Sequence, residues 1–206
     1  MRHWTRSFPG LILFAVLVFG LVLPAQGDLV LFDDELSFTE AVEGIDLELD
    51  DFSDLIEGYY ADPIRRWVSD PSEYSMASTS IVGLSAISSQ VTTVLPKSMI
   101  SLQSETGLLR AMGGTFSITD FTGSPITGQI RILLQDGQSF TWDVQDGSTF
   151  VGVIGIDDSV TSLTVGAATN APLVTVTGVL IGAVPSPAAW PLVLMPLAGL
   201  SRRRRI

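Results

Sequence analysis

The chain contains no cysteine and only one histidine, His3, in 206 residues. The absence of cysteine excludes disulfides, zinc–thiolate sites and cysteine nucleophiles together, so the fold depends on its hydrophobic core. His3 lies in a segment that we expect to be removed on export, and histidine is the side chain most often used as a general base. A Ser-His-Asp triad is therefore excluded from the exported chain.

Basic residues are scarce between Asp28 and Ala183, the segment that holds all 22 acidic residues. Five of the 11 basic residues lie there: Arg65, Arg66, Lys97, Arg110 and Arg131. The formal charge of this body is therefore 5 minus 22, or −17. Such a body repels nucleic acid and anionic lipid. We therefore expect no nucleic-acid partner.

Residues 1–27 read as a secretory signal peptide. Two arginines precede an apolar run, residues 11–23, and small residues then mark a cleavage site between Gly27 and Asp28. An uncleaved N-terminal anchor is the alternative. Both readings predict export through the inner membrane, with the secretion machinery as a partner.

Residues 184–206 have three parts. The first part consists of Val184, Pro185, Ser186 and Pro187. It cannot continue a strand or a helix, because proline lacks an N–H and restricts the residue before it. The second, residues 188–200, is apolar and would enter a bilayer, although its 13 residues are fewer than the roughly 20 of a spanning helix. The third part consists of Arg202, Arg203, Arg204 and Arg205. These charges resist crossing the membrane and hold this end of the chain in the cytoplasm.

This tail resembles the PEP-CTERM sorting signal of exopolysaccharide-producing Gram-negative bacteria, with Ser186 where that family usually has glutamate. The resemblance implies cleavage near Pro185 by an exosortase. It also implies at least transient anchoring in the inner membrane through residues 188–200, with the body in the periplasm. The final place would be the cell surface or the extracellular space. A permanent membrane anchor is the alternative.

Residues 28–183 are expected to form an all-β sandwich, because short runs of alternating apolar and polar residues are separated by turn signals. Asp-Gly pairs between such runs favour hairpins. A short helix is expected around Ser37–Val42, and residues 57–74 are expected to be a loop. The clearest strands are expected at 45–49, 115–118, 129–134, 139–144, 149–156, 160–165 and 173–181.

The body also resembles the jelly-roll-like β-sandwich domain common in PEP-CTERM proteins, through the runs Arg110–Gly114 and Thr149–Gly152. In that family an Asp-Asn pair usually occupies the last strand before the sorting signal. Here that strand reads Val174–Val179 without such a pair.

Two segments carry candidate binding residues. The acidic run Asp46–Asp54 could hold a cation, although it lacks the spacing of an EF-hand loop, and a solvated strand face is the other reading. A metal site thus stays unknown, with calcium open and no other cofactor expected. Aromatic and basic side chains of the second segment could bind sugars or could cap the core: Tyr59, Tyr60, Arg65, Arg66, Trp67 and Tyr74.

No motif indicates an enzyme, and no catalytic residue is assigned. Among 22 acids a carboxylate pair can always be found, so such a pair carries no weight as a glycosidase signal. The sequence favours a noncatalytic exported protein of the cell surface or extracellular matrix, associated with exopolysaccharide. A periplasmic or surface carbohydrate-active enzyme and a permanently anchored binding module are the alternatives.

Overall fold

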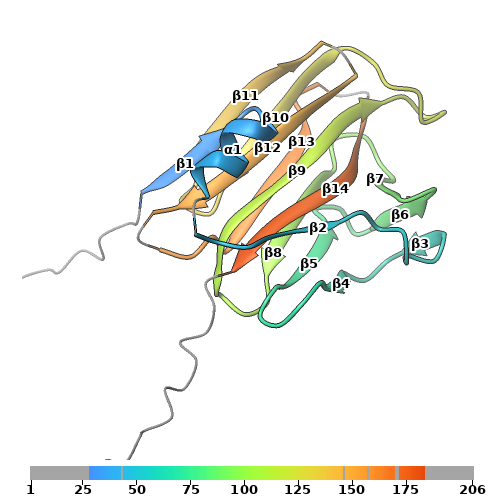
Figure 1. The fold of residues 1–206 in the computed structure, drawn as a ribbon. Coiled ribbons are helices and arrows are strands. Elements are labelled where there is room, and N and C mark those ends of the chain that lie inside the picture. The colour runs from blue at the N-terminus through green and yellow to red at the C-terminus, as the bar shows by residue number, and fades with distance from the viewer. Residues whose placement is uncertain (1–27, 43, 146, 157, 170–171, 184–206) are drawn as a thin grey trace, which may run out of the picture.

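Two antiparallel sheets pack face to face, and one short helix covers part of the outside (Figure 1). The computed structural model describes residues 28–183 except 43, 146, 157, 170 and 171. Its architecture confirms the expected all-β sandwich with a short helix near the N-terminus. The elements in chain order are β1 (Leu29–Phe32), α1 (Glu35–Ala41), β2 (Leu47–Asp50), β3 (Gly58–Tyr60), β4 (Ile64–Trp67), β5 (Glu73–Ser78), β6 (Leu84–Ile87), β7 (Gln90–Thr93), β8 (Met99–Ser104), β9 (Leu109–Thr119), β10 (Gly128–Leu134), β11 (Ser139–Val144), β12 (Ser148–Gly155), β13 (Ser162–Ala167) and β14 (Leu173–Ala183).

The strand order brings distant parts of the chain together. Sheet A has the order β1-β12-β9-β14-β7-β6-β3, and β2 also pairs with β14. Sheet B has the order β11-β10-β13-β8-β5-β4. In the middle of sheet A, β14 pairs with β9, so that Val174 lies opposite Ile118. The outer face of sheet A is thus assembled from segments that are far apart in the sequence.

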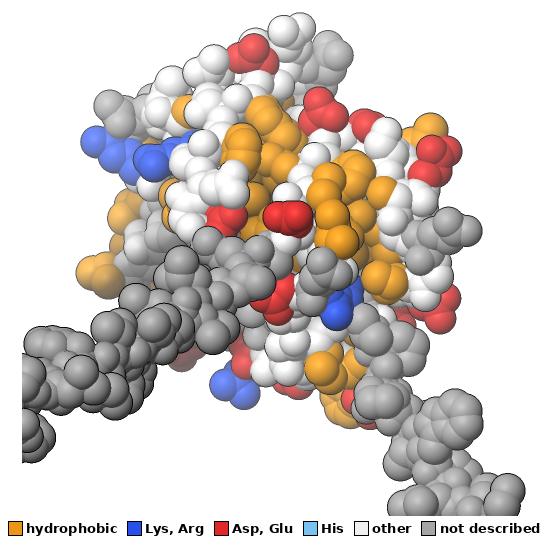
Figure 2. Space-filling model, turned by 90° about the vertical axis from the view of Figure 1, so that its left-hand side faces the viewer, with side chains coloured by type: hydrophobic (Ala, Val, Ile, Leu, Met, Phe, Trp, Pro, Cys, Tyr) orange, Lys and Arg blue, Asp and Glu red, His pale blue; other side chains and the backbone are white. Residues whose placement is uncertain are grey.

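The core lies between the sheets and follows from the alternation along each strand. In β9, Phe116 and Ile118 are fully buried in it, whereas Ser117 and Thr119 face the other way. Burial of these apolar side chains is the main favourable contribution to folding. At the sandwich edge formed by β1 and β11, the core is less completely covered, and Trp142 is only partly buried. Figure 2 shows hydrophobic side chains at the surface on this side of the molecule.

Helix α1 packs on sheet A at a place where two paired glycines leave room for it. Phe38 of the helix is fully buried, and its ring lies 5.2 Å from that of Phe150. Beneath the rings, Gly113 and Gly152 are directly paired on β9 and β12. A Cβ on Gly152 would lie 2.5 Å from Cδ2 of Phe38, so the helix can dock only over glycine. Asp34 begins the helix, since its side chain accepts a hydrogen bond from Ser37 N at 2.7 Å.

The expectation of a loop over residues 57–74 was wrong. The segment contains β3, β4 and the start of β5, which are edge strands or pair with one. Strands of three or four residues show too little alternation to be recognised in a sequence. Their pairing partners decide the structure, as when Arg66 of β4 lies opposite Tyr74 of β5.

Both expected targeting segments, residues 1–27 and 184–206, lie outside the described residues. The signal peptide, the motif Val184–Pro187 and the arginines 202–205 therefore stay predictions. In the part of the chain that the structure does describe, no helix has the length and apolar character needed to cross a membrane.

Candidate functional site

The outer face of sheet A carries three neighbouring hollows that share lining residues, and we refer to them together as one groove. The first, of about 340 Å³, shares Gln90 and Thr119 with the second, also of about 340 Å³. The second shares Thr115 and Thr177 with the third, of about 180 Å³. Hydroxyl and amide side chains from four strands line this hydroxyl groove: Gln90, Thr92, Thr115, Ser117, Thr119, Ser148, Thr175 and Thr177.

Two turns form the walls of the first hollow. The hairpin between β6 and β7 supplies Ile87, and both residues of its two-residue turn have positive φ. The turn after β9 is held by Asp120, whose Oδ1 accepts hydrogen bonds from the backbone N–H groups of Thr122 and Ser124 at 2.8 and 3.0 Å. Phe121 lies in this turn and is 72% exposed. The first hollow therefore has a hydroxyl floor and an apolar rim.

The floor of the first hollow is a chain of three threonines, which we call the threonine relay: Thr119, Thr175 and Thr92. Thr92 donates its hydroxyl proton to the carbonyl oxygen of Val174 at 3.1 Å. Thr175 donates to Thr92 Oγ1 at 2.9 Å. Thr119 and Thr175 lie 3.1 Å apart, and because the proton of Thr175 is already used, Thr119 must be the donor in this pair.

Negative charge lies at both ends of the groove. Hydrogen bonds from Thr122, and then from the Ser124 backbone, hold the pKa of Asp120 below its usual range, so that this carboxylate is ionised at neutral pH. At the other end, Glu35 in the first turn of α1 lines the third hollow. Between them the described lining is uncharged.

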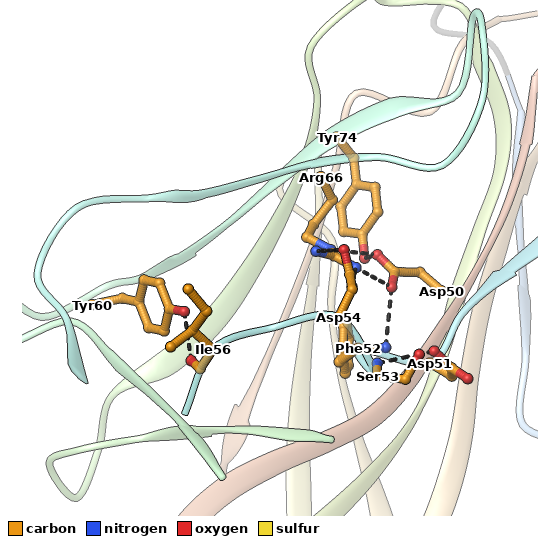
Figure 3. Close-up of polar contacts among 9 residues, drawn as sticks. All are labelled: Asp50, Asp51, Phe52, Ser53, Asp54, Ile56, Tyr60, Arg66 and Tyr74. Atoms are coloured by element: carbon orange, nitrogen blue, oxygen red, sulfur yellow. Dashed lines mark hydrogen bonds and ion pairs between the residues drawn. The ribbon is translucent and has the colours of Figure 1, made fainter. Parts of the chain in front are cut away.

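A second polar region lies elsewhere and is closed. The Asp50 cluster consists of Asp50, Asp54, Arg66 and Tyr74, and it joins the end of β2 to β4 and β5 (Figure 3). Arg66 donates from Nε and Nη2 to the two carboxylate oxygens of Asp50, each at 2.7 Å. Tyr74 Oη donates to Asp50 Oδ2, also at 2.7 Å.

The environment of the cluster explains its pairing. Asp50 is only 4% exposed and Tyr74 is fully buried, and a buried charge is costly unless it is paired and hydrogen-bonded. Burial, followed by the charge of Asp50, raises the pKa of Tyr74 well above its ordinary value. Hydrogen bonds from Arg66 lower the pKa of Asp54. Every member thus has its partner within the protein.

The acidic run Asp46–Asp54 fits the expected solvated face only in part, since Asp46, Asp51 and Asp54 are exposed but Asp50 is buried. Asp50 is not on a solvated face, and its carboxylate, like that of Asp54, binds Arg66. Among the described residues, no three His, Cys, Asp or Glu side chains gather in a way that could hold a metal ion. Calcium binding stays an untested prediction.

The sequence left two roles open for the aromatic side chains, sugar binding and capping of the core, and their burial divides them into two groups. Tyr74 belongs to the core, and Tyr60 packs against it while its hydroxyl donates to the carbonyl of Ile56 at 2.6 Å. Tyr59 and Trp67 are exposed. Trp67, at 76% exposure, lines a separate hollow of about 410 Å³ on the edge of the sandwich, together with Asp70 and Glu73.

Sequence reasoning missed the hydroxyl groove. A signal was present, because Thr115, Ser117 and Thr119 alternate with apolar residues in β9, and Thr175 and Thr177 flank Val176 in the same way in β14. Alternation shows that these hydroxyls share a face of their own strand. It does not show that the two strands are neighbours.

No protein-family model and no curated protein matches the chain. Among solved structures, a mutant of a family 29 carbohydrate-binding module complexed with mannohexaose is 12% identical, with a TM-score of 0.41 over 67% of this chain and 92% of that one. A second mutant of such a module is 15% identical, with a TM-score of 0.39 over the same shares of the two chains. A family 29 module described without a mutation is 11% identical, with a TM-score of 0.36 over 66% of this chain and 89% of that one. At these values the likeness does not establish what this chain binds.

Proposed function

We propose that the chain is an exported, noncatalytic protein of the cell surface or extracellular matrix that binds polysaccharide in the hydroxyl groove. The observation that carries the proposal is the groove itself, in which a hydroxyl and amide lining between Asp120 and Glu35 meets an apolar rim. From Thr115 to Thr119 alone the floor extends about 13 Å, at roughly 3.3 Å per residue of strand. A ligand longer than one sugar ring fits such a shape.

The two kinds of lining have separate roles in this proposal. Apolar surface supplies affinity in ligand sites, and a small number of polar groups fix the orientation of the ligand. Phe121 offers a flat ring for the C–H face of a sugar, and the threonines offer oxygens for its hydroxyls. The turn that carries Phe121 is held by Asp120, so little ordering is needed when the ligand binds.

Binding without hydrolysis agrees with the chemistry of the groove acids. A glycosidase needs one carboxylic acid that can donate a proton and a second carboxylate across the scissile bond. Asp120 accepts three hydrogen bonds and its pKa is lowered, so it is a poor proton donor. Glu35 lines the hollow at the far end of the groove.

The groove is tested by comparing two exposed aromatic residues in the full-length chain, purified in mild detergent. We expect Phe121→Ala to weaken retention on the host exopolysaccharide in affinity electrophoresis by about tenfold, as for the loss of one aromatic contact. Trp67→Ala is the matched control, because Trp67 is similarly exposed but lies at another hollow. A loss of binding in Trp67→Ala with none in Phe121→Ala would move the site away from the groove. Release of reducing ends by the unaltered protein would contradict a noncatalytic role.

We further propose that a sorting enzyme processes the chain near Pro185, with residues 188–200 as the transient membrane segment and the terminal arginines as the cytoplasmic stop. The support is the tail sequence together with the signal peptide expected over residues 1–27, which would direct the body to the periplasm. Intact-mass measurement of the protein from cells and medium tests this. Secreted protein that still ends in Arg202–Ile206 contradicts processing.

A further inference from the structure

The hydroxyl protons of the first hollow are committed to the protein. All three protons of the threonine relay point to other protein oxygens, ending at Val174. The hydroxyl of Thr122 donates to Asp120 Oδ1 at 2.6 Å. A hydroxyl has one donor and two acceptor positions, so each of these threonines retains only acceptor capacity toward the hollow.

The acceptors that face the hollow can be traced along the relay. Thr175 and Thr92 each use one acceptor position inside the relay, and Thr119 uses none there. With the ionised Asp120 beside them, the described lining of this hollow consists largely of hydrogen-bond acceptors. Two lining side chains carry other donors: the amide of Gln90 offers both a donor and an acceptor, and the hydroxyl of Ser88 donates to Glu57 Oε1 at 3.5 Å.

A group that fills this hollow must therefore donate protons. Sugar hydroxyls do so, whereas a carboxylate only accepts and would leave the threonine oxygens unpaired. A polar group that is removed from water and left without a hydrogen bond weakens binding by most of its desolvation free energy. Asp120 repels a ligand carboxylate at short range, and the net negative charge of the body repels it at long range.

On the basis of the proposed function, we infer that the first hollow binds the hydroxyl groups of uncharged polysaccharide and excludes carboxylated polysaccharide. The threonine relay sets this specificity because it turns every relay proton away from the ligand. The inference names the class of polymer that the groove takes, and it can fail while polysaccharide binding itself stands.

The test uses pairs of polymers with the same backbone, and the full-length chain in mild detergent. Affinity electrophoresis is run with dextran against carboxymethyl dextran, and with hydroxyethyl cellulose against carboxymethyl cellulose, alongside the host exopolysaccharide. We expect at least one uncharged polymer to retain the protein and its carboxylated partner to bind at least about tenfold more weakly. At 1 M salt the screening length falls to about 3 Å, so repulsion by the whole body is removed while contacts in the hollow persist. Selectivity that survives 1 M salt supports the inference.

Thr175→Val tests the relay directly, since valine has the same shape without the hydroxyl. Thr119 then loses its acceptor, and its proton becomes available to the ligand. We expect binding of the uncharged polymer to fall about fivefold, as for one hydrogen bond, and the selectivity against the carboxylated partner to narrow. Thr164→Val is the matched control, because Thr164 donates to Ser101 Oγ at 3.0 Å on sheet B, outside the groove.

The outcomes separate the two claims. Equal retention on charged and uncharged polymers at 1 M salt overturns the inference and leaves polysaccharide binding intact. Unchanged selectivity in Thr175→Val overturns the role of the relay. If the unaltered protein is retained by none of the polymers, including the host exopolysaccharide, the proposed function fails and the inference fails with it.

Discussion

The Asp50 cluster and the hydroxyl groove are both rich in polar side chains, yet they differ in where their hydrogen-bonding capacity is used. In the cluster, Asp50 is surrounded by donors from Arg66 and Tyr74 and is closed to solvent. In the groove, the relay threonines have used their protons but retain acceptors that face an open hollow.

The cause of the difference is charge. A buried carboxylate must be paired, and breaking such a pair leaves an uncompensated charge. A threonine floor carries no net charge, so it tolerates acceptors that only water or a ligand fills. The density of polar residues therefore does not distinguish the two regions, whereas unfilled hydrogen-bonding capacity facing a hollow does. Four predictions sharpen this comparison.

The largest effect on stability is expected from Asp50→Ala. Arg66 would keep only the exposed Asp54 as a partner, so the free energy of unfolding should fall by about 3–5 kcal/mol. Urea denaturation measures it, with Asp51→Ala as the control, because Asp51 is exposed and accepts only from Ser53 N. If the two variants are equally stable, the cluster does not have the structural role assigned to it.

Tyr74→Phe should have a smaller effect, because the ring stays in the core and only one hydrogen bond to a charged group is lost. We expect the free energy of unfolding to fall by about 1.5–3 kcal/mol. Tyr59→Phe removes an exposed hydroxyl and should leave stability unchanged. Polysaccharide binding should be the same in both variants, and a loss of binding in Tyr74→Phe would link the two regions.

Alkaline pH should weaken the cluster gradually. The pKa of Tyr74 is higher in the folded than in the unfolded protein, so its contribution is fully present below about pH 10, near the unfolded value, and is lost as the pH rises through the folded value. Denaturation curves between pH 8 and pH 12 measure this. Tyr74→Phe should lose less stability over that range than the unaltered protein. Parallel pH profiles for the two proteins would contradict the assignment.

Gln90→Ala should have the smallest effect on stability. Its side chain is exposed in the groove, so the free energy of unfolding should change by less than about 0.5 kcal/mol. Binding of uncharged polysaccharide should nevertheless weaken, because an amide in both of the first two hollows is lost. Gln103→Ala, which alters an exposed glutamine on sheet B, is the control. A Gln90→Ala variant that binds normally would restrict the site to the threonine floor and Phe121.

Much of the fold could be predicted from the sequence, and most of the site could not. The strand at 139–144 was placed correctly, and the helix around Ser37 was found to within about two residues. These predictions succeeded because alternation and capping are local properties. Arg66 and Asp50 were each noted, but their pairing depends on β4 lying near the end of β2, which no local pattern states.

The sequence by itself determined the composition of the site: a body with a formal charge of −17, without cysteine, and with hydroxyls on alternate positions of β9 and β14. Only the tertiary structure decided that these hydroxyls meet. Thr119, Thr175 and Thr92 form a relay because β14 lies between β9 and β7 in sheet A. The direction of every proton in that relay follows from the carbonyl of Val174, which can only accept, and from the single proton of each hydroxyl. Periodicity sets which face a side chain takes, and strand order sets which side chains become its neighbours.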